Sequence, residues 1–365
     1  MIHVLVVDDS AFMRKALSMM LERDGEVRVV DTARDGQQAL EKIQEYDPDV
    51  VTMDIEMPRM DGLTALRRIM DEAPRPVLMV SSLTQDGAAA TVEAMEAGAV
   101  GFLPKQRSRV SLKITEIEDD LIKRIKSAAH SNMGAIRRKR GSRRRAASRR
   151  GTPDRLSFPE AQIITVGIST GGPFALQQVI PALPRDLPVP VVVVQHMPPH
   201  FTQSLANRLD ASSALQVAEA EDGMSVEPGR VIIAAGGHHL MFRSGARHTI
   251  VKTPSEPSDT LHRPSVDVMF ASAVEHYNGQ VLGLIMTGMG KDGLEGATAL
   301  KERGGRLIAQ DEATSVVYGM PRAVAEAELT DLVLPMDDVA EALAHAVGAP
   351  THSAAASSAP TSHLN

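Results

Sequence analysis

The chain has 365 residues, more than one compact domain usually needs, so two domains are expected. Hydrophobic residues make up 43% and charged residues 23%, which is ordinary for a globular protein and excludes a disordered or membrane-spanning class. The absence of cysteine excludes disulfides, thiolate metal sites and a cysteine nucleophile. No stretch has the apolar length of a transmembrane helix and the first residues lack a signal-peptide pattern, so a cytoplasmic location is expected.

The net charge of -7 hides one strongly basic segment, residues 137–150, which holds eight arginines, one lysine and no acidic residue. Because like charges repel and the segment offers little to bury, it is predicted to be a linker or an interaction arm. The end of the chain is rich in Ala, Ser, Thr and Pro and is predicted to be disordered. The predicted divisions are a first domain at 1–128, a basic linker at 129–158, a second domain at 159–348 and a tail at 349–365.

Short apolar runs alternate with helix-period segments in the first domain. The predicted strands are 2–7, 27–31, 50–53, 77–80 and 100–103. Strands separated by helices predict a parallel sheet covered by helices. Apolar residues at roughly helical spacing in 112–125 predict a last helix against this sheet.

The same alternation resumes in the second domain. The predicted strands are 163–168, 191–194, 231–234, 281–286, 306–309 and 332–334. Their apolar runs are nearly continuous, as expected for parallel strands buried on both faces. Closely spaced strand-like pieces in 230–252 suggest an antiparallel ribbon. The predicted fold class is α/β with two doubly wound parallel-sheet domains.

Polar side chains follow several strands of the first domain. Asp8 and Asp9 come directly after the first strand and Asp54 after the third, while Ser81 and Lys105 follow later strands. The carboxyl ends of parallel strands meet at one edge, so the three carboxylates are expected together there, where their oxygens suit Mg²⁺. A carboxylate beside Mg²⁺ and a lysine can attack phosphorus and form an aspartyl phosphate. The alternative for each residue alone is a helix cap or a surface charge.

These five residues make the first domain similar to the receiver domain of bacterial response regulators. The resemblance implies that Asp54 is phosphorylated, with Ser81 and Lys105 in support. It also implies that Mg²⁺ is bound by Asp9, Asp54 and the carbonyl of Glu56, with Asp8 assisting through water. The switch aromatic of that family falls on Phe102.

In the second domain, Ser169 lies between two glycines where a predicted strand turns into a helix. The spacing Gly167-x-Ser169-x-Gly171 is that of a nucleophile elbow, in which small neighbours let the chain bend and expose Oγ. The alternatives are a glycine-rich phosphate cradle and a helix cap.

A base and a carboxylate follow two other strands of the second domain. His196 could take the proton of Ser169 and return it to a leaving group, and Asp292 could hold the other imidazole nitrogen. The alternative for Asp292 is a helix capping pair with Glu295. The backbone amides of Thr170 and Met289 are the candidate oxyanion donors. His238 and His239 lack an acidic partner at motif spacing and are expected to be structural.

The motifs of both domains together resemble the chemotaxis response-regulator protein-glutamate methylesterase family. Those in the second domain are Gly-Ile-Ser-Thr-Gly-Gly-Pro, Val-Gln-His-Met-Pro, His-Arg-Pro-Ser-Val-Asp and Met-Thr-Gly-Met-Gly-Lys-Asp-Gly. The resemblance implies a flavodoxin-like receiver joined to a larger Rossmann-like three-layer domain, and a serine hydrolase with the triad Ser169, His196 and Asp292. Residues 262–267 carry no role beyond marking the family.

The implied activity is a phosphorylation-activated removal of methyl esters from glutamates of methyl-accepting chemotaxis receptors, with deamidation of receptor glutamines. The implied phosphodonor is the chemotaxis histidine kinase. The only cofactor expected is Mg²⁺ at the receiver, with none in the esterase site, and membrane contact is expected only through receptors. The basic segment is longer than regulation by domain contact requires, and the tail has no aromatic docking motif.

Two alternative functions are compatible with parts of the sequence. The basic segment could bind nucleic acid in a non-enzymatic regulator, but no recognition-helix module accompanies it, so no nucleic-acid partner is expected. The Ser169 loop could bind a nucleotide, but it lacks a lysine for the β-phosphate.

Overall fold

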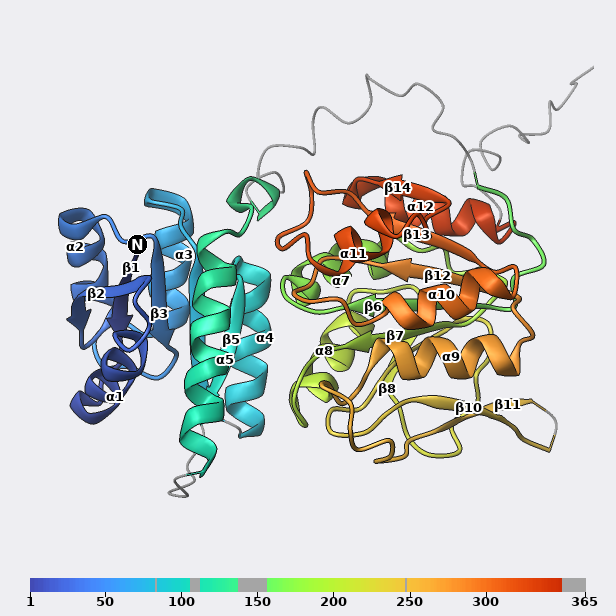
Figure 1. The fold of residues 1–365 in the computed structure, drawn as a ribbon, viewed down its shortest axis with the longest axis horizontal. Helices are drawn as coiled ribbons and strands as arrows, with labels where there is room; N and C mark the ends of the chain where they lie inside the picture. The colour runs from blue at the N-terminus through green and yellow to red at the C-terminus, as the bar shows by residue number, and fades with distance from the viewer. Residues whose placement is uncertain (83, 106–111, 137–155, 247, 350–365) are drawn as a thin grey trace, which may run out of the picture.

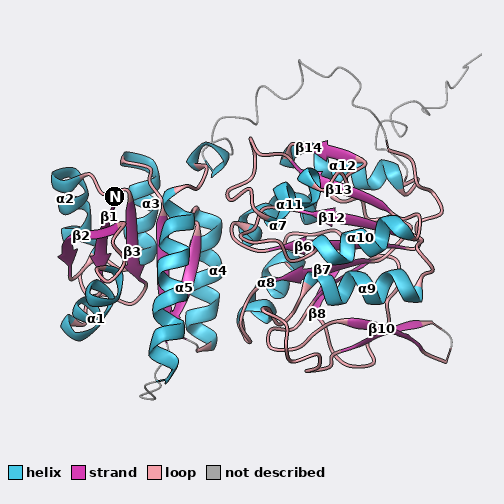
Figure 2. Cartoon of the chain, viewed as in Figure 1, coloured by secondary structure: helices cyan, strands magenta, loops and turns pink. Residues whose placement is uncertain are grey.

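Two parallel sheets, each packed between helices, make up most of the molecule (Figures 1 and 2). The computed structural model describes residues 1–82, 84–105, 112–136, 156–246 and 248–349. The predicted α/β fold with two parallel sheets is therefore confirmed. The basic segment 137–150 and the tail from residue 350 lie outside the described residues. No described helix combines the length and apolar character needed to cross a membrane.

The first sheet has the strand order β2-β1-β3-β4-β5, and all neighbours are parallel. Its strands are β1 (Ile2–Val7), β2 (Val27–Ala33), β3 (Val50–Asp54), β4 (Val77–Ser82) and β5 (Gly101–Lys105). Its helices are α1 (Ala11–Leu21), α2 (Gly36–Tyr46), α3 (Gly62–Glu72), α4 (Gln85–Ala97) and α5 (Leu112–Ala129). Helix α1 contacts α5, while α2, α3 and α4 contact one another in a row. The apolar strand runs are buried between these two layers.

The second sheet has seven parallel strands in the order β14-β13-β12-β6-β7-β9-β8. Its strands are β6 (Ile163–Ile168), β7 (Val191–Gln195), β8 (Gln216–Glu219), β9 (Arg230–Ile233), β12 (Val281–Ile285), β13 (Arg306–Gln310) and β14 (Leu332–Leu334). The helices around it are α7 (Gly172–Val179), the short η2 (Ile180–Ala182), α8 (Phe201–Asp210), α9 (Val266–His276), α10 (Leu294–Glu302), α11 (Met320–Glu326) and α12 (Met336–Ala346). Helices α7, α8 and α12 form one layer, and α9, α10 and α11 form the other.

One part of the second sheet differs from its prediction. The antiparallel ribbon expected over residues 230–252 is confined to β10 (Met241–Ser244) and β11 (Thr249–Lys252), which pair as a hairpin beside α9. The preceding β9 overlaps the predicted strand 231–234 and joins the large sheet between β7 and the edge strand β8. Strand β8 itself was not predicted from the sequence. The last three residues of β9, Val-Ile-Ile, are apolar and buried, which suits an inner parallel strand.

The two sheets come together through helices of both units. Helix α4 contacts α7 and α8, and the segment after α5 bonds to the loop after β13. Asn132 donates its backbone N–H to the carbonyl of Val316, and its side chain donates to the carbonyl of Ala313, both at 2.9 Å. The first unit therefore lies against the second with α4 and α5 at the contact (Figure 1).

Candidate active site

The candidate nucleophile, base and acid follow the three central strands of the large sheet. Strand β6 pairs with β7 on one side and with β12 on the other. The order of the strands therefore reverses at β6: strands β7, β8 and β9 are added on one side of it and strands β12, β13 and β14 on the other side, although all run parallel. Ser169 follows β6, His196 follows β7, and Asp292 lies in the loop after β12. Ligand sites of open α/β sheets form at such a reversal, beyond the carboxyl ends of the strands.

The turn at Ser169 is held from several sides. Ser169 N–H donates to the carbonyl of Thr287 at 3.0 Å, and the Ser169 carbonyl accepts from the side chain of Gln195 at 3.0 Å. The left-handed backbone falls on Gly171, with φ of 78°, rather than on the serine. A Cβ at Gly288 would lie only 2.9 Å from Ser169 Cβ, so a glycine there leaves room for the serine. The predicted bend therefore depends on glycines on both sides of the nucleophile.

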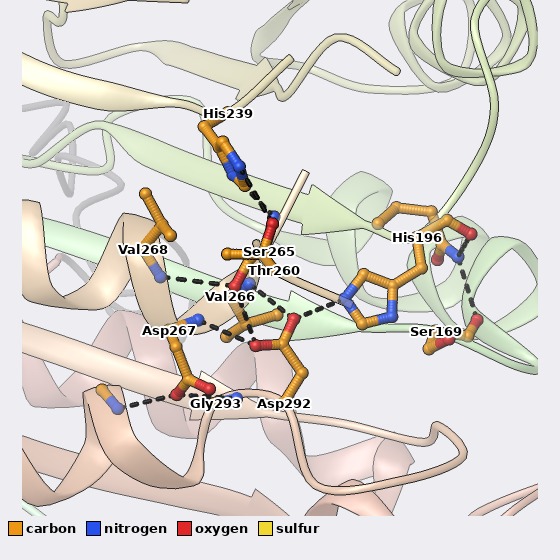
Figure 3. A network of polar contacts seen from close by, with 12 residues as sticks. Ser169, His196, His239, Thr260, Ser265, Val266, Asp267, Val268, Asp292 and Gly293 are labelled. Atoms are coloured by element: carbon orange, nitrogen blue, oxygen red, sulfur yellow. Dashed lines mark hydrogen bonds and ion pairs between the residues drawn. The ribbon is translucent and has the colours of Figure 1, made fainter. Parts of the chain in front are cut away.

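His196 and Asp292 form a close pair (Figure 3). Nε2 of His196 donates to Oδ2 of Asp292 at 2.7 Å, and the two side chains are only 7% and 11% exposed. The other ring nitrogen, Nδ1, is buried without a hydrogen-bond partner among the described residues. In Figure 3 that nitrogen lies on the side of the ring that faces Ser169. An imidazole held this way can accept a proton at Nδ1.

The carboxylate of Asp292 sits at the start of helix α9. It accepts from Ser265 Oγ at 2.9 Å and from the backbone amides of Val266 and Asp267 at 2.8 and 3.1 Å (Figure 3). Burial alone would raise the pKa of Asp292, but the bond from His196 and these amides hold that pKa well below its usual range. Asp292 is therefore a carboxylate that orients the imidazole.

Asp267 accepts backbone hydrogen bonds at the start of helix α10, as Asp292 does at the start of α9. Its Oδ1 accepts from the amides of Gly293 and Gly296 at the start of α10, at 3.0 and 2.7 Å. Burial raises the pKa of Asp267 to about 6, and the charge of Asp292 adds to this effect. The alternative interpretation of Asp292 as a cap of its own helix is wrong, because Gly293 is the N-cap of α10 and Asp292 bonds to α9. Asp292 thus satisfies the start of α9, which contains Asp267, and Asp267 satisfies the start of α10, which follows Asp292.

Residues 262–267, to which the sequence alone assigns no role, surround His196 and Asp292 in the structure. Ser265 is the N-cap of α9, and its hydroxyl reaches Asp292. His239 is buried and accepts from the Ser265 amide at 3.3 Å, which fits its predicted structural role. His262 stacks on His196 with ring centroids 4.1 Å apart. The sequence Ser-Val-Asp before an apolar helix is a local signal for the N-cap at Ser265. No local pattern indicates that Ser265 also donates a hydrogen bond to Asp292.

Thr170 and Met289 lie together at the surface of the second unit that faces the first. Both line a small cavity whose other walls come from the first unit, at Leu78, Val100, Gly101, Arg124, Ser127 and Ala128. Neither amide donates to a protein acceptor within the part of the chain that the structure describes. Their role as oxyanion donors stays a prediction.

The three carboxylates predicted in the first unit do come together. One oxygen from each of Asp8, Asp9 and Asp54 lies within 4.8 Å of the others. Lys105 Nζ contacts Asp54 at 2.7 Å and Asp8 at 3.0 Å. Burial raises the pKa of Asp54 to about 6, and the Asp8 charge adds to this, while Lys105 opposes it. Clustered carboxylate oxygens are a donor set that fits Mg²⁺.

The remaining predicted residues of this site are less defined. Ser81 lies in β4, but its side chain lies outside the described side chains. Glu56 follows β3, and the role of its carbonyl stays a prediction. Phe102 is buried and stacks on Phe201 of α8, with ring centroids 4.7 Å apart and planes 9° apart. The predicted switch aromatic therefore contacts the other unit.

Comparisons with known proteins agree with this arrangement. The chain matches the CheB methylesterase family model at residues 164–343 and the response regulator receiver domain model at residues 4–115. It is 49% identical to the protein-glutamate methylesterase/protein-glutamine glutaminase 1 of Oleidesulfovibrio alaskensis, over 95% of this chain and 100% of that protein. It is 43% identical to a protein of Pyrococcus horikoshii named protein-glutamate methylesterase/protein-glutamine glutaminase, over 95% and 94%.

A solved structure is also similar. The Thermotoga maritima CheB methylesterase catalytic domain is 46% identical and covers 50% of this chain and 97% of that chain, with a TM-score of 0.49. The relatives match over nearly their whole length, and this chain matches both family models. The chain belongs to the CheB family of receiver-linked protein-glutamate methylesterases/protein-glutamine glutaminases, as the sequence motifs predicted.

Proposed function

We propose that this chain hydrolyses the γ-glutamyl methyl esters of methyl-accepting chemotaxis receptors, deamidates receptor glutamines, and is activated by phosphorylation of Asp54. The observation that carries the proposal is the His196–Asp292 pair, whose free Nδ1 lies on the side of Ser169 at the strand reversal. The similar proteins named above support the substrate class.

The proposed reaction has two steps. Ser169 Oγ attacks the ester carbonyl while His196 takes its proton at Nδ1, and the proton then passes to the departing methoxide, which leaves as methanol. Water, activated by the same imidazole, hydrolyses the acyl-enzyme and leaves a glutamate side chain and a free Ser169. A glutamine substrate gives the same acyl-enzyme and releases ammonia. Asp292 stays ionised and stabilises the imidazolium.

The tetrahedral intermediate carries negative charge on its oxygen. The amides of Thr170 and Met289 are proposed to stabilise it, because both lie at the cavity and lack a protein acceptor among the described residues. Donors of this kind contribute about 3 kcal/mol each to the transition state.

The receiver is proposed to bind Mg²⁺ through Asp9, Asp54 and the carbonyl of Glu56, with Asp8 contributing through water. The clustered oxygens of Asp8, Asp9 and Asp54 fit such an ion. Bound Mg²⁺ would neutralise charge on the phosphoryl group. Asp54 is proposed to accept that group from the chemotaxis histidine kinase, and Lys105 to hold its oxygens. The proposal places the protein in the cytoplasm, where its kinase has access to ATP.

Phosphorylation is proposed to uncover the esterase site. The first unit walls the cavity that Thr170 and Met289 line, and Phe102 stacks on Phe201 across the contact. A substrate glutamate cannot reach the amides while that wall is in place. A shift of Phe102 on phosphorylation would remove a stacked aromatic pair and favour the open state.

The test is methanol release from methylated receptor by the whole protein, with and without a small phosphodonor. The phosphodonor should raise the rate, Ser169→Ala and Asp292→Asn should remove most of it, and Asp54→Asn should remove only the stimulation. Ser212→Ala, at an exposed serine on the far end of α8, is the matched control. Wild-type activity at the level of Ser169→Ala would contradict the proposal. The nucleic-acid alternative rests on residues 137–150, which lie outside the described residues.

A further inference from the structure

The ring of His262 lies against the face of the proposed catalytic imidazole. The two rings have centroids 4.1 Å apart and planes 24° apart, so His262 covers one face of His196. Among the described residues, the ring of His196 has one hydrogen bond, from Nε2 to Asp292. A single bond fixes one point of a ring but leaves its plane free to tilt, and a stacked ring removes that freedom.

The segment that carries His262 is itself anchored to the acid of the triad. Three residues on, Ser265 donates to Asp292 at 2.9 Å, and its amide donates to the buried His239. Thr260, two residues before His262, contacts His239 Nε2 at 3.2 Å. One loop therefore holds Asp292 at one point and the plane of His196 at another.

The electrostatic setting keeps His262 uncharged. Burial, with the neighbouring charge of His196, lowers the pKa of His262 to about 4. Arg124 on helix α5 acts in the same direction, while Asp292 and Asp120 oppose it. Arg124 is held in place by Asp120 and by the carbonyl of Phe102. A neutral ring can lie beside the imidazolium that His196 becomes, whereas a charged one would repel it.

We propose that His262 is a positioning residue for the esterase reaction: its neutral ring face holds the plane of His196 so that Nδ1 stays aimed at Ser169. The inference rests on the proposed function and adds a residue to it. His262 makes no bond to substrate in this role, so its flat shape matters and its nitrogens do not. The phenyl ring of His262→Phe should therefore preserve the activity, whereas the methyl group of His262→Ala should not.

The experiment compares His262→Ala, His262→Phe and the wild type as whole proteins activated with a small phosphodonor and Mg²⁺. Methanol release from methylated receptor gives kcat and KM, and labelling of Ser169 by a fluorophosphonate reports the reactivity of the triad without the receptor. His262→Ala should lower kcat and the labelling rate by about 100-fold with little change in KM, since misplacement of a catalytic group has effects of that size. His262→Phe should stay within about fivefold of the wild type. Thermal unfolding and phosphorylation of Asp54 verify that each variant is folded.

Two results would overturn the inference. One is an alanine variant that keeps the wild-type kcat and labelling rate. The other is a phenylalanine variant as slow as the alanine one although folded, which would mean that the nitrogens of His262 take part in the chemistry. Failure of the proposed function looks different: Ser169 would be labelled by the probe in the wild type, yet no methanol would leave the receptor.

Discussion

Arg208 on helix α8 forms an ion pair with Glu96 on helix α4, with an N–O distance of 2.5 Å, and lies 4.0 Å from Glu93 on the same helix. Helix α4 packs on the first sheet and helix α8 on the second, so this ion pair joins the two units. It lies at the same contact as the stack of Phe102 on Phe201. The hydrogen bond to Glu96 raises the pKa of Arg208. Polar and aromatic contacts therefore join the receiver to the esterase unit beside the cavity that Thr170 and Met289 line.

Reversal of this charge should open the contact. Arg208→Glu places three carboxylates together, and like charges repel across the interface. We expect methanol release by the unphosphorylated protein to rise several-fold, and the further gain on phosphorylation to shrink. Adding Glu96→Arg to the same chain should bring the low unphosphorylated rate back.

The control for this reversal is Arg322→Glu, because Arg322 pairs with Glu326 of its own helix and forms no ion pair with the receiver within the described residues. Arg322→Glu should leave methanol release by the unphosphorylated protein unchanged. If Arg208→Glu leaves methanol release by the unphosphorylated protein unchanged, the contact does not limit access to Ser169.

The low pKa of His262 makes stability depend on pH. In the unfolded chain this side chain takes up a proton below about 6.5, whereas in the folded protein it does so only below about 4. The unfolded state therefore binds more protons between pH 4 and 6.5, and stability falls as pH drops through this window. Relative to His262→Phe, the wild type should lose about 1–2 kcal/mol between pH 7.5 and pH 5. Calorimetric unfolding at the two pH values measures this loss of stability. The control is His248→Phe, because His248 is exposed.

Much of the fold could be predicted because parallel strands buried on both faces are apolar throughout. Strands β6, β7 and β12 come close to this pattern, with Thr165 in β6 and Gln195 at the end of β7 as polar exceptions, and they also indicated where Ser169, His196 and Asp292 would lie. Strand β8 was missed because it is a short edge strand, Gln-Val-Ala-Glu, with only its valine buried. The hairpin of β10 and β11 was placed too widely because short strands in succession do not reveal which sheet each one joins.

The details of the site depend on contacts between distant segments. The Ser265 hydroxyl reaches Asp292 from 27 residues away, and no local pattern encodes that contact. The stacking of His262 on His196 is equally remote, since it joins residues far apart in the chain. Strand ends predict which residues meet at an edge, but packing decides which nitrogen bonds to which oxygen.

Removal of Mg²⁺ should separate the two activities of the chain. A chelator should stop transfer of phosphate to Asp54 from a small phosphodonor, with a loss of about 100-fold or more, because a metal supplies several kcal/mol at a phosphoryl group. Asp9→Asn should have a similar effect at limiting Mg²⁺. Unphosphorylated methanol release should not change in either case, since the carboxylate cluster of Asp8, Asp9 and Asp54 lies in the receiver. Asp49→Asn, at the opposite edge of the sheet, is the control, and a chelator that also stops the unphosphorylated reaction would contradict the prediction.

Loss of the Ser265 hydroxyl should weaken both the fold and the triad. Ser265→Ala removes a hydrogen bond to the Asp292 carboxylate and the side-chain cap of α9, where the hydroxyl accepts from Val268 at 3.4 Å. A lost cap lowers the free energy of unfolding by about 1 kcal/mol, and a lost bond to a charged group by about 1.5–3 kcal/mol. If half of that second effect falls on the transition state, the unphosphorylated rate drops about four- to tenfold. Ser10→Ala is a close match, because Ser10 caps α1 with the same 3.4 Å bond, to Met13, but lies in the receiver. It should lower stability through the cap alone and leave that rate unchanged, so equal rates for the two variants would show that Ser265 acts only on α9.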